Sequence, residues 1–194
     1  MCWNATVSLN TFLFSAFITA LAYYNNIITL SFALYYCSFF GIQLVEFFLW
    51  KYKSLNRVMS QIGLLLILLQ PFLALQTIPE RNIRTGFTLL YLVNLVIYFL
   101  VNWPIDFSTT VAKNGHLKWN WVNIHPIFIF IWFAFVLVSI IYGGSQIGLV
   151  FVVLTFAVSF WMYYSSGTFG STWCFIANAL FIYLAYKIFR KSMC

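Results

Sequence analysis

Residues 27–50, IITLSFALYYCSFFGIQLVEFFLW, decide the fold class of this chain. An apolar helix of about 20 residues crosses the roughly 30 Å hydrocarbon core of a bilayer, so this stretch is long enough to span it. Gln43 and Glu46 lie close to its far end. Carboxylates at membrane depth are rare and face a bundle interior, a wet cavity or a partner, which makes Glu46 the first functional candidate.

The composition extends this reading to the whole chain. Of its 194 residues, 63% are hydrophobic and only 7% are charged, whereas a soluble domain has roughly 25% charged residues. We therefore expect one transmembrane helical domain over residues 1–194. The net charge of +7 would suggest nucleic acid in a soluble protein. Here Lys and Arg lie between or after the apolar runs, where they act as topology signals and contact lipid headgroups, so membrane lipid is the expected partner and nucleic acid is not.

Apolar runs bounded by turn residues predict about seven transmembrane helices. They cover residues 9–24, 27–50, 58–75, 86–103, 127–142, 147–165 and 173–188. Because most connections are short, sequential helices run antiparallel, and the fold class is an all-α, up-and-down bundle. Only residues 104–126 form a substantial loop.

Polar residues recur at helical spacing within the runs and so form stripes that should face one another rather than lipid. The stripes are Ser8, Thr11, Ser15 and Thr19; Gln43, Glu46 and Trp50; Tyr91, Asn94 and Tyr98; Thr155, Ser159 and Tyr163; and Ser171, Cys174 and Asn178. Ordinary interhelical hydrogen bonds explain such stripes, and so does a path for a small solute or a proton.

The third run breaks this regularity. Gln61 and Gln70 are nine residues apart and point to opposite faces. Pro71 has no N–H, so it frees the carbonyl of Ile67, and we expect Gln70 or a water to satisfy that carbonyl.

Antiparallel threading brings the reactive side chains to one end of the bundle. The long loop contains GHLKWNW, residues 115–121. Its tryptophans, Trp119 and Trp121, suit a segment held at the membrane surface; alternatively the loop is a lid whose His116 meets Glu46 and relays protons. In the turn GTFGSTWC, residues 167–174, free N–H groups would hold an anion, or Ser171 or Thr172 caps the last helix.

The candidate polar site has ten members, with no catalytic, cofactor-binding or metal-binding residue assigned. They are Gln43, Glu46, Gln61, Asn94, Asn102, His116, Trp119, Ser171, Cys174 and Asn178. The four cysteines have no metal-ligand spacing, and a disulfide between Cys2 and Cys174 is left open. No cofactor is expected. A homo-oligomer is also left open.

The opening MCWNATVSLNTFLFS, the IQLVEFFLW around Glu46, the LLQP at Gln70, the GHLKWNW loop and the GSTWCFIAN of the last helix together resemble uncharacterised multi-pass membrane proteins of giant DNA viruses of algae and protists and of some eukaryotes. The resemblance implies a seven-helix membrane fold and a viral or algal source. It implies no reaction.

Orientation and function are weighed from the same residues. Lys and Arg are tied at five on each face, and three cations near the C-terminus favour a cytosolic C-terminus and an outside or lumenal N-terminus. A small channel or transporter centred on Glu46 ranks first. A structural or scaffolding membrane protein, such as a viral membrane component, ranks second, and a membrane-embedded lipid-modifying enzyme third, because two histidines and three acids are poor material for catalysis.

Overall fold

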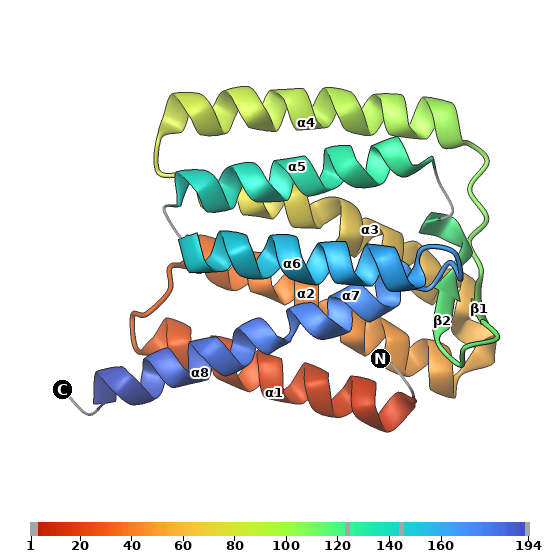
Figure 1. The fold of residues 1–194 in the computed structure, drawn as a ribbon, viewed down its shortest axis with the longest axis horizontal. Helices are drawn as coiled ribbons and strands as arrows, with labels where there is room; N and C mark the ends of the chain where they lie inside the picture. Colours follow the sequence, from red (N-terminus) through yellow and green to blue (C-terminus); the bar gives the residue numbers. More distant parts are fainter. Residues whose placement is uncertain (1–3, 123–124, 144–145, 193–194) are drawn as a thin grey trace.

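The fold is a bundle of α-helices with one β-hairpin at its end (Figure 1). It is seen in a computed structural model that describes residues 4–122, 125–143 and 146–192. The helices are α1 (Ala5–Tyr24), α2 (Leu30–Lys51), α3 (Asn56–Leu75), α4 (Arg81–Asn102), α5 (Pro126–Tyr142), α6 (Gln146–Tyr163), α7 (Phe169–Ala177) and α8 (Ala179–Ser192). The strands are β1 (Thr109–Val111) and β2 (Leu117–Trp119), and two 3-10 turns are η1 (Lys53–Leu55) and η2 (Asn120–Val122).

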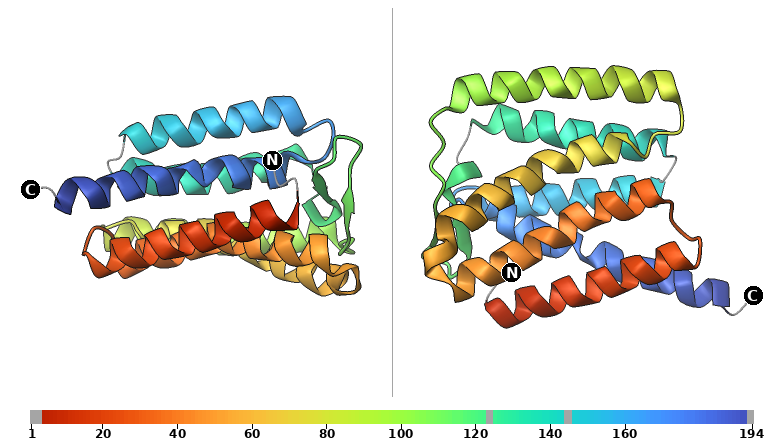
Figure 2. Two further views of the ribbon diagram at one scale, coloured as in Figure 1. Left: turned by 90° about the horizontal axis from the view of Figure 1, so that it is seen from below. Right: turned by 180° about the vertical axis from the view of Figure 1, so that it is seen from behind.

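The helices run up and down, with α7 and α8 forming one broken rod (Figure 1). Seen from below, α1, α2 and α3 lie on one side of the bundle and α6, α7 and α8 on the other (Figure 2). Across this division α1 contacts α8, α2 contacts α7 and α3 contacts α5, while α4 lies at the edge against α3 and α5. The predicted all-α, up-and-down bundle is confirmed.

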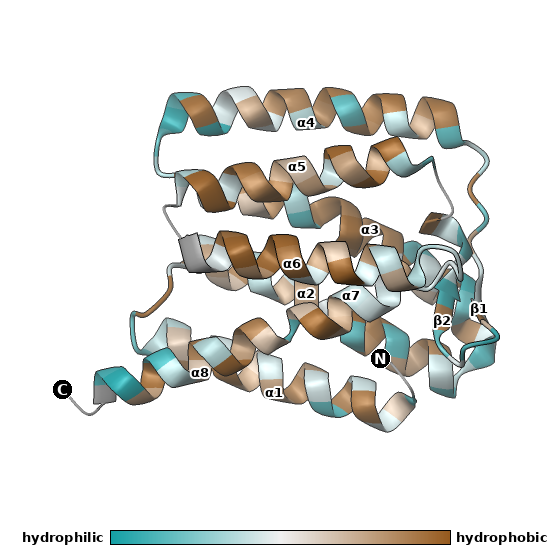
Figure 3. Ribbon diagram, in the orientation of Figure 1, coloured by the Kyte–Doolittle hydropathy of each residue, from teal (hydrophilic) through white to brown (hydrophobic). Residues whose placement is uncertain are grey.

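Five helical segments are long and apolar enough to cross a membrane. They are Ala5–Tyr24, Leu30–Lys51, Lys53–Leu75, Arg81–Asn102 and Phe169–Lys191. The apolar helices Pro126–Tyr142 and Gly148–Tyr163 are shorter. Apolar residues dominate the helices, and hydrophilic ones gather at the hairpin, the start of α4 and the end of α8 (Figure 3). The count of seven crossings stays a prediction.

Helix α3 passes through Pro71 without ending. The carbonyl of Ile67, which loses its usual helical partner at Pro71, accepts a hydrogen bond of 2.8 Å from the indole N–H of Trp132 on α5. Gln70 is completely buried but donates to the carbonyl of Ser38 on α2. The prediction that Gln70 or a water satisfies Ile67 is therefore wrong, and the freed carbonyl instead ties α5 to α3.

The loop after α4 contains the hairpin, which the sequence did not reveal. Thr109 of β1 pairs with Trp119 of β2 in antiparallel register. Asn56 of α3 binds the backbone of Thr109 twice, and Ser60 shares a hydrogen bond of 2.9 Å with its hydroxyl. On the other side, Asn114 donates to the hydroxyls of Ser166 and Thr168. The hairpin therefore bridges the start of α3 and the α6–α7 turn as a docked cap.

The predicted last span is broken at Asn178, between α7 and α8. The Asn178 side chain donates to the carbonyl of Cys174 at 2.6 Å and accepts from the Ser15 hydroxyl of α1 at 2.9 Å. An asparagine that bonds its own preceding turn offers the backbone an alternative to a continuous helix. The break thus comes with a polar link to α1.

Candidate functional site

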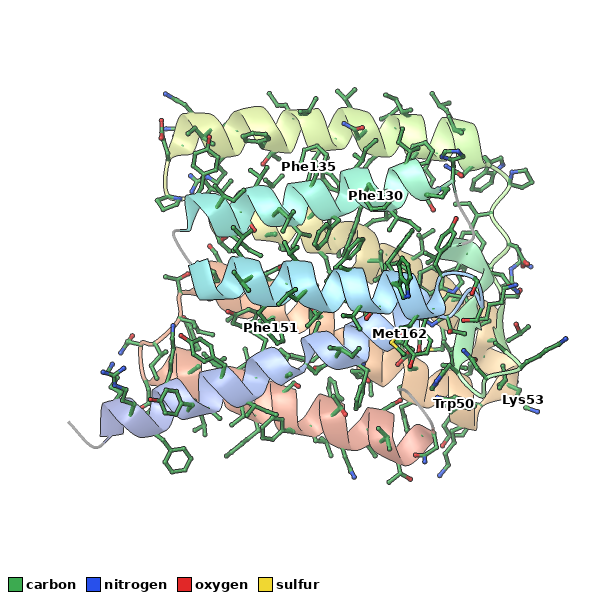
Figure 4. All side chains as sticks on the ribbon, in the orientation of Figure 1. Trp50, Lys53, Phe130, Phe135, Phe151 and Met162 are labelled. Atoms are coloured by element: carbon green, nitrogen blue, oxygen red, sulfur yellow. The ribbon has the colours of Figure 1, made fainter. Side chains whose placement is uncertain are left out.

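The polar residues of α2 lie inside the bundle, toward its hairpin end. Gln43 and Glu46 are completely buried, and both have interaction partners. The Cys174 thiol of α7 lies within electrostatic range of the Glu46 carboxylate. Trp50, one turn after Glu46, and Lys53 mark the same end of the molecule in Figure 4. The carboxylate is therefore enclosed by protein rather than by lipid or bulk water.

The α7 residues of the predicted site share this buried setting. Ser171 and Cys174 are each 1% exposed and Asn178 is 7% exposed. Helix α7 begins at Phe169 with Thr168 as the residue before it. Thr172 donates its hydroxyl to the carbonyls of Thr168 and Phe169. The prediction that Ser171 or Thr172 caps this helix is therefore wrong, because the helix starts earlier than the apolar pattern indicates.

His116 lies in the cap, next to α6. Its ring meets the ring of Tyr163 edge-on, with centroids 5.7 Å apart. Burial lowers the pKa of the His116 imidazole from its usual value, since the charged form loses its hydration. No hydrogen bond between described residues joins His116 to Glu46. The structure thus places the predicted lid over the bundle but turns its histidine toward Tyr163.

Three predicted amides lie outside this cluster. Gln61 is exposed on α3, on the face opposite the buried Gln70 as their spacing requires. Asn94 and Asn102 are half-buried and donate to the carbonyls of Leu90 and Tyr98, one turn back on α4. Gln61 therefore does not belong to an interior site, and Asn102 serves its own helix.

The tryptophans of the hairpin and of η2 are buried within the protein. Trp119 and Trp121 are 4% and 1% exposed and stack with centroids 4.8 Å apart. A Cβ on Gly170 of α7 would lie 2.8 Å from the Trp119 ring, and a Cβ on Gly63 of α3 would lie 2.8 Å from Trp121. Trp119 and Trp121 thus pack against the helices, and the position of their segment at the membrane surface stays a prediction. The glycines of α3 and α7 make room for them.

An apolar cavity lies between α3, α4, α5 and α7, beside β2 and η2. The cavity is partly open, and about 70 Å³ of it is space that a water-sized group can occupy. Its lining consists of Leu64, Ile67, Leu68, Tyr91, Asn94, Leu95, Tyr98, Trp119, Val122, Phe128, Ile129, Ile131, Trp132, Phe169, Gly170, Trp173 and Cys174.

Two tyrosines of α4 explain why this space exists. The Tyr91 hydroxyl donates to the carbonyl of Leu68, and the rings of Tyr91 and Phe135 have centroids 5.1 Å apart. Two turns later the rings of Tyr98 and Phe128 have centroids 5.7 Å apart. Helix α4 is also held near its start by the Gln76–Thr88 hydrogen bond and the Phe87–Tyr142 ring contact, and the cavity lies beside Tyr91, Asn94 and Tyr98.

Cys174 links the cavity to the polar cluster. Its side chain lines the cavity and also lies within electrostatic range of Glu46. No group of three or more His, Cys, Asp or Glu side chains suited to a metal ion occurs in the described residues. Cys2 lies outside the described residues, and Cys174 is a free thiol in the structure, which speaks against the pairing of the two. The arrangement offers a buried acid beside an apolar binding space.

Sequence reasoning missed most of the cavity. Trp132, Trp173 and Phe128 are aromatic residues in apolar helices, and nothing in their spacing separates a cavity wall from a packed core. Only Asn94, Trp119 and Cys174 of the ten predicted site residues line it.

Comparison of the chain with protein-family models, with curated protein sequences and with solved structures finds no match.

Proposed function

We propose that this chain is a multi-pass integral membrane protein that transports a lipophilic molecule, with the apolar cavity as its binding site and Glu46 as its ionisable element. One observation carries the proposal. Cys174 forms part of the cavity wall and lies within electrostatic range of the completely buried Glu46. A molecule in the cavity would thereby contact a side chain that senses the charge of Glu46.

The lining selects the kind of molecule. Nearly every side chain around the cavity is apolar or aromatic, so a hydrated ion would lose its water there without replacement ligands. The cavity also adjoins α4, of whose most apolar 18 residues only 11% are buried. This edge of the bundle faces the bilayer, and a lipophilic molecule would enter from the lipid. The cavity favours a carrier over an ion channel.

Glu46 supplies a group that can bind and release a proton, which apolar residues cannot do. A carboxyl group enclosed by protein gains or loses its proton according to the field and polarity around it. Occupation of the cavity would change the surroundings of Glu46 through Cys174, which lines it. Proton binding and substrate binding are then coupled through the same few side chains, as expected of ionisable groups inside membrane proteins.

The proposal includes seven crossings. Five segments have the length and apolarity to span, and the 17 residues of α5 rise about 26 Å, slightly less than the hydrocarbon core of about 30 Å. The C-terminus is proposed to be cytosolic because the last turn of α8 carries Arg190 and Lys191, next to Lys187.

Movement of a fluorescent single-chain lipid between the leaflets of proteoliposomes tests this function. The lipid carries a nitrobenzoxadiazole group that external dithionite destroys, so its rate of arrival outside is measured directly. We expect wild-type protein to accelerate the movement, Glu46→Gln to reduce it to the rate of empty liposomes, and Leu68→Trp, which fills the cavity, to reduce it equally. Leu65→Trp is the matched control, because Leu65 is 58% exposed on the same helix.

A structural role is the second candidate, and the Ser15–Asn178 link favours it. This bond joins α1 to the α7–α8 break at 2.9 Å, and bonds of this kind stabilise membrane helix pairs by about 0.6 kcal/mol. If wild-type protein moves the lipid no faster than empty liposomes, transport is excluded and the polar stripes serve only to hold helices together.

A further inference from the structure

A more polar recess adjoins the apolar cavity at the hairpin end of the bundle. We call it the vestibule. Five of its nine lining residues, including Trp119 and Gly170, also line the apolar cavity. The vestibule adds Lys118, Tyr164, Ser165 and Gly167 to the lining, and its volume is about 240 Å³. The two spaces therefore adjoin through shared residues, and the vestibule is the more polar of the two.

Lys118 is held in place at the vestibule. It lies in β2, and its aliphatic stem rests on Gly167 in the α6–α7 turn, where a Cβ would lie 2.9 Å from the lysine Cε and 3.2 Å from its Cδ. Gly167 has a φ of +70°, a backbone conformation that glycine adopts without strain. Any other residue at position 167 would push the lysine aside. The turn thus fixes the direction of a half-buried cation.

Lys118 and Trp119 are the residues of β2 that line the vestibule. No carboxylate forms a salt bridge with Lys118 in the part of the chain that the structure describes. Trp119, the next residue, is 4% exposed, and its indole N–H has no hydrogen-bond acceptor among the described residues. Buried donors without an acceptor are rare in folded proteins. Lys118 is therefore the charged donor that the vestibule offers to an anionic group.

The position of the vestibule matches the level of lipid headgroups. The hairpin covers the ends of the helices (Figure 1), and long Lys side chains at such ends keep the charge at the interface while the stem contacts apolar surface. From there the apolar cavity leads inward toward α4. A ligand that fills both spaces needs a charged head and an apolar chain.

We propose that the vestibule and the apolar cavity together bind a single-chain amphiphile with an anionic head, with the head at Lys118 and the chain between α4, α5 and α7. This inference rests on the proposed function, in which the apolar cavity takes up a lipophilic molecule, and names the class of that molecule. The head is a carboxylate, as in a fatty acid, or a phosphate, as in a lysophosphatidic acid.

Binding of cis-parinaric acid and its methyl ester tests the anionic head. The probe accepts excitation energy from tryptophan, and Trp119, Trp132 and Trp173 line the apolar cavity. With protein in phosphatidylcholine nanodiscs, we expect saturable transfer and an affinity about tenfold higher for the acid than for the ester, because the ester cannot form the charged hydrogen bond to Lys118. Lys118→Gln should remove this preference and leave ester binding unchanged. Lys118→Arg should keep it.

Lys113→Gln is the matched control, because Lys113 is exposed in the same hairpin connection and does not line the vestibule. Unlabelled oleic acid and lysophosphatidic acid as competitors distinguish the two head groups, and lysophosphatidylcholine should compete like the ester. Equal affinity for acid and ester, a preference that survives Lys118→Gln, or an equal loss for both probes in that variant overturns the anionic head alone. Absence of saturable transfer for both probes overturns the proposed function as well.

Discussion

Helices α2 and α4 are both long and apolar, yet they lie in opposite surroundings. We compare a continuous apolar stretch of 18 residues in each helix. In α2 56% of these residues are buried, and in α4 only 11% are. Helix α2 has neighbours on both sides and encloses Gln43 and Glu46, whereas α4 touches the bundle through Tyr91 and Tyr98 and leaves a cavity beside it. Apolar composition alone therefore does not distinguish the tightly packed half of this molecule from its loosely attached edge.

The largest difference in unfolding free energy is expected when a glycine of the closely packed part, on α3, and a glycine of the edge helix α4 are each replaced by alanine. Gly63→Ala places its Cβ 2.8 Å from the Trp121 ring, whereas Gly86→Ala on α4 meets nothing within 4 Å. We expect Gly63→Ala to lower the free energy of unfolding by about 1–3 kcal/mol. Gly86→Ala should raise it by up to about 1 kcal/mol through helix propensity.

Thermal unfolding of the two variants in the same detergent measures this contrast. Equal stability changes for Gly63→Ala and Gly86→Ala would mean that the cap is not closely docked on α3.

The contact between α3 and α5 depends on Trp132. Trp132→Phe removes the donor to the Ile67 carbonyl, and an unsatisfied buried carbonyl costs about 1–3 kcal/mol. In a Pro71→Ala background, the backbone N–H of residue 71 is available to the same carbonyl. We therefore expect Trp132→Phe to cost less there, as measured by a double-mutant cycle of unfolding free energies. Additive effects would show that Trp132 does not compensate for Pro71.

The cap should respond to pH through His116. Burial lowers the pKa of this histidine from its usual value near 6.5, so below that pH the unfolded chain binds a proton that the folded cap resists. Stability should fall as the pH is lowered through 6.5, by at most about 1.4 kcal/mol per pH unit for one proton. The unfolding free energy of wild type and of His116→Gln is measured between pH 7.5 and about 5. The difference between the two slopes against pH isolates the contribution of His116, and identical slopes would refute the prediction.

The smallest effect is expected at the α1–α8 link. Ser15→Ala removes the donor to Asn178, and hydrogen bonds between membrane helices contribute about 0.6 kcal/mol. Unfolding in mixed micelles should show a loss of about this size. No further loss should follow when Ser15→Ala is added to Asn178→Ala, and a full additional loss would mean that the two side chains act independently.

The course of the helices was predictable because it follows from local hydropathy. The predicted run 27–50 corresponds to α2 at Leu30–Lys51, and 86–103 corresponds to α4 at Arg81–Asn102. The hairpin was not predictable, since strands of three residues carry little pattern. Its stability comes from Asn56, Ser60 and Thr168, which are distant in sequence. The break at Asn178 likewise depends on a partner, Ser15, from the other end of the chain.

The candidate site likewise contains residues that a local pattern predicts and residues that only tertiary contacts bring together. The stripe of Gln43 and Glu46 indicated a buried polar face, because polar residues at helical spacing share one side of α2. The cavity depends on how closely α4 approaches α5, which is set by Tyr91 and Tyr98 against their partners and not by any local pattern. The role of Lys118 was not predictable either, because its contact with Gly167 depends on the position of β2 in the folded structure.

Competition for an apolar photolabel decides whether the cavity beside α4 is a binding site. Trifluoromethyl-phenyldiazirine should label Tyr98 and Trp132 in wild-type proteoliposomes, and excess oleic acid should suppress this labelling while sparing Trp161, which is 88% exposed. Leu68→Trp should abolish the suppressible fraction and Leu65→Trp should preserve it. Labelling of Tyr98 and Trp132 that no competitor reduces, or that Leu68→Trp leaves intact, would contradict a lipophilic ligand in this cavity.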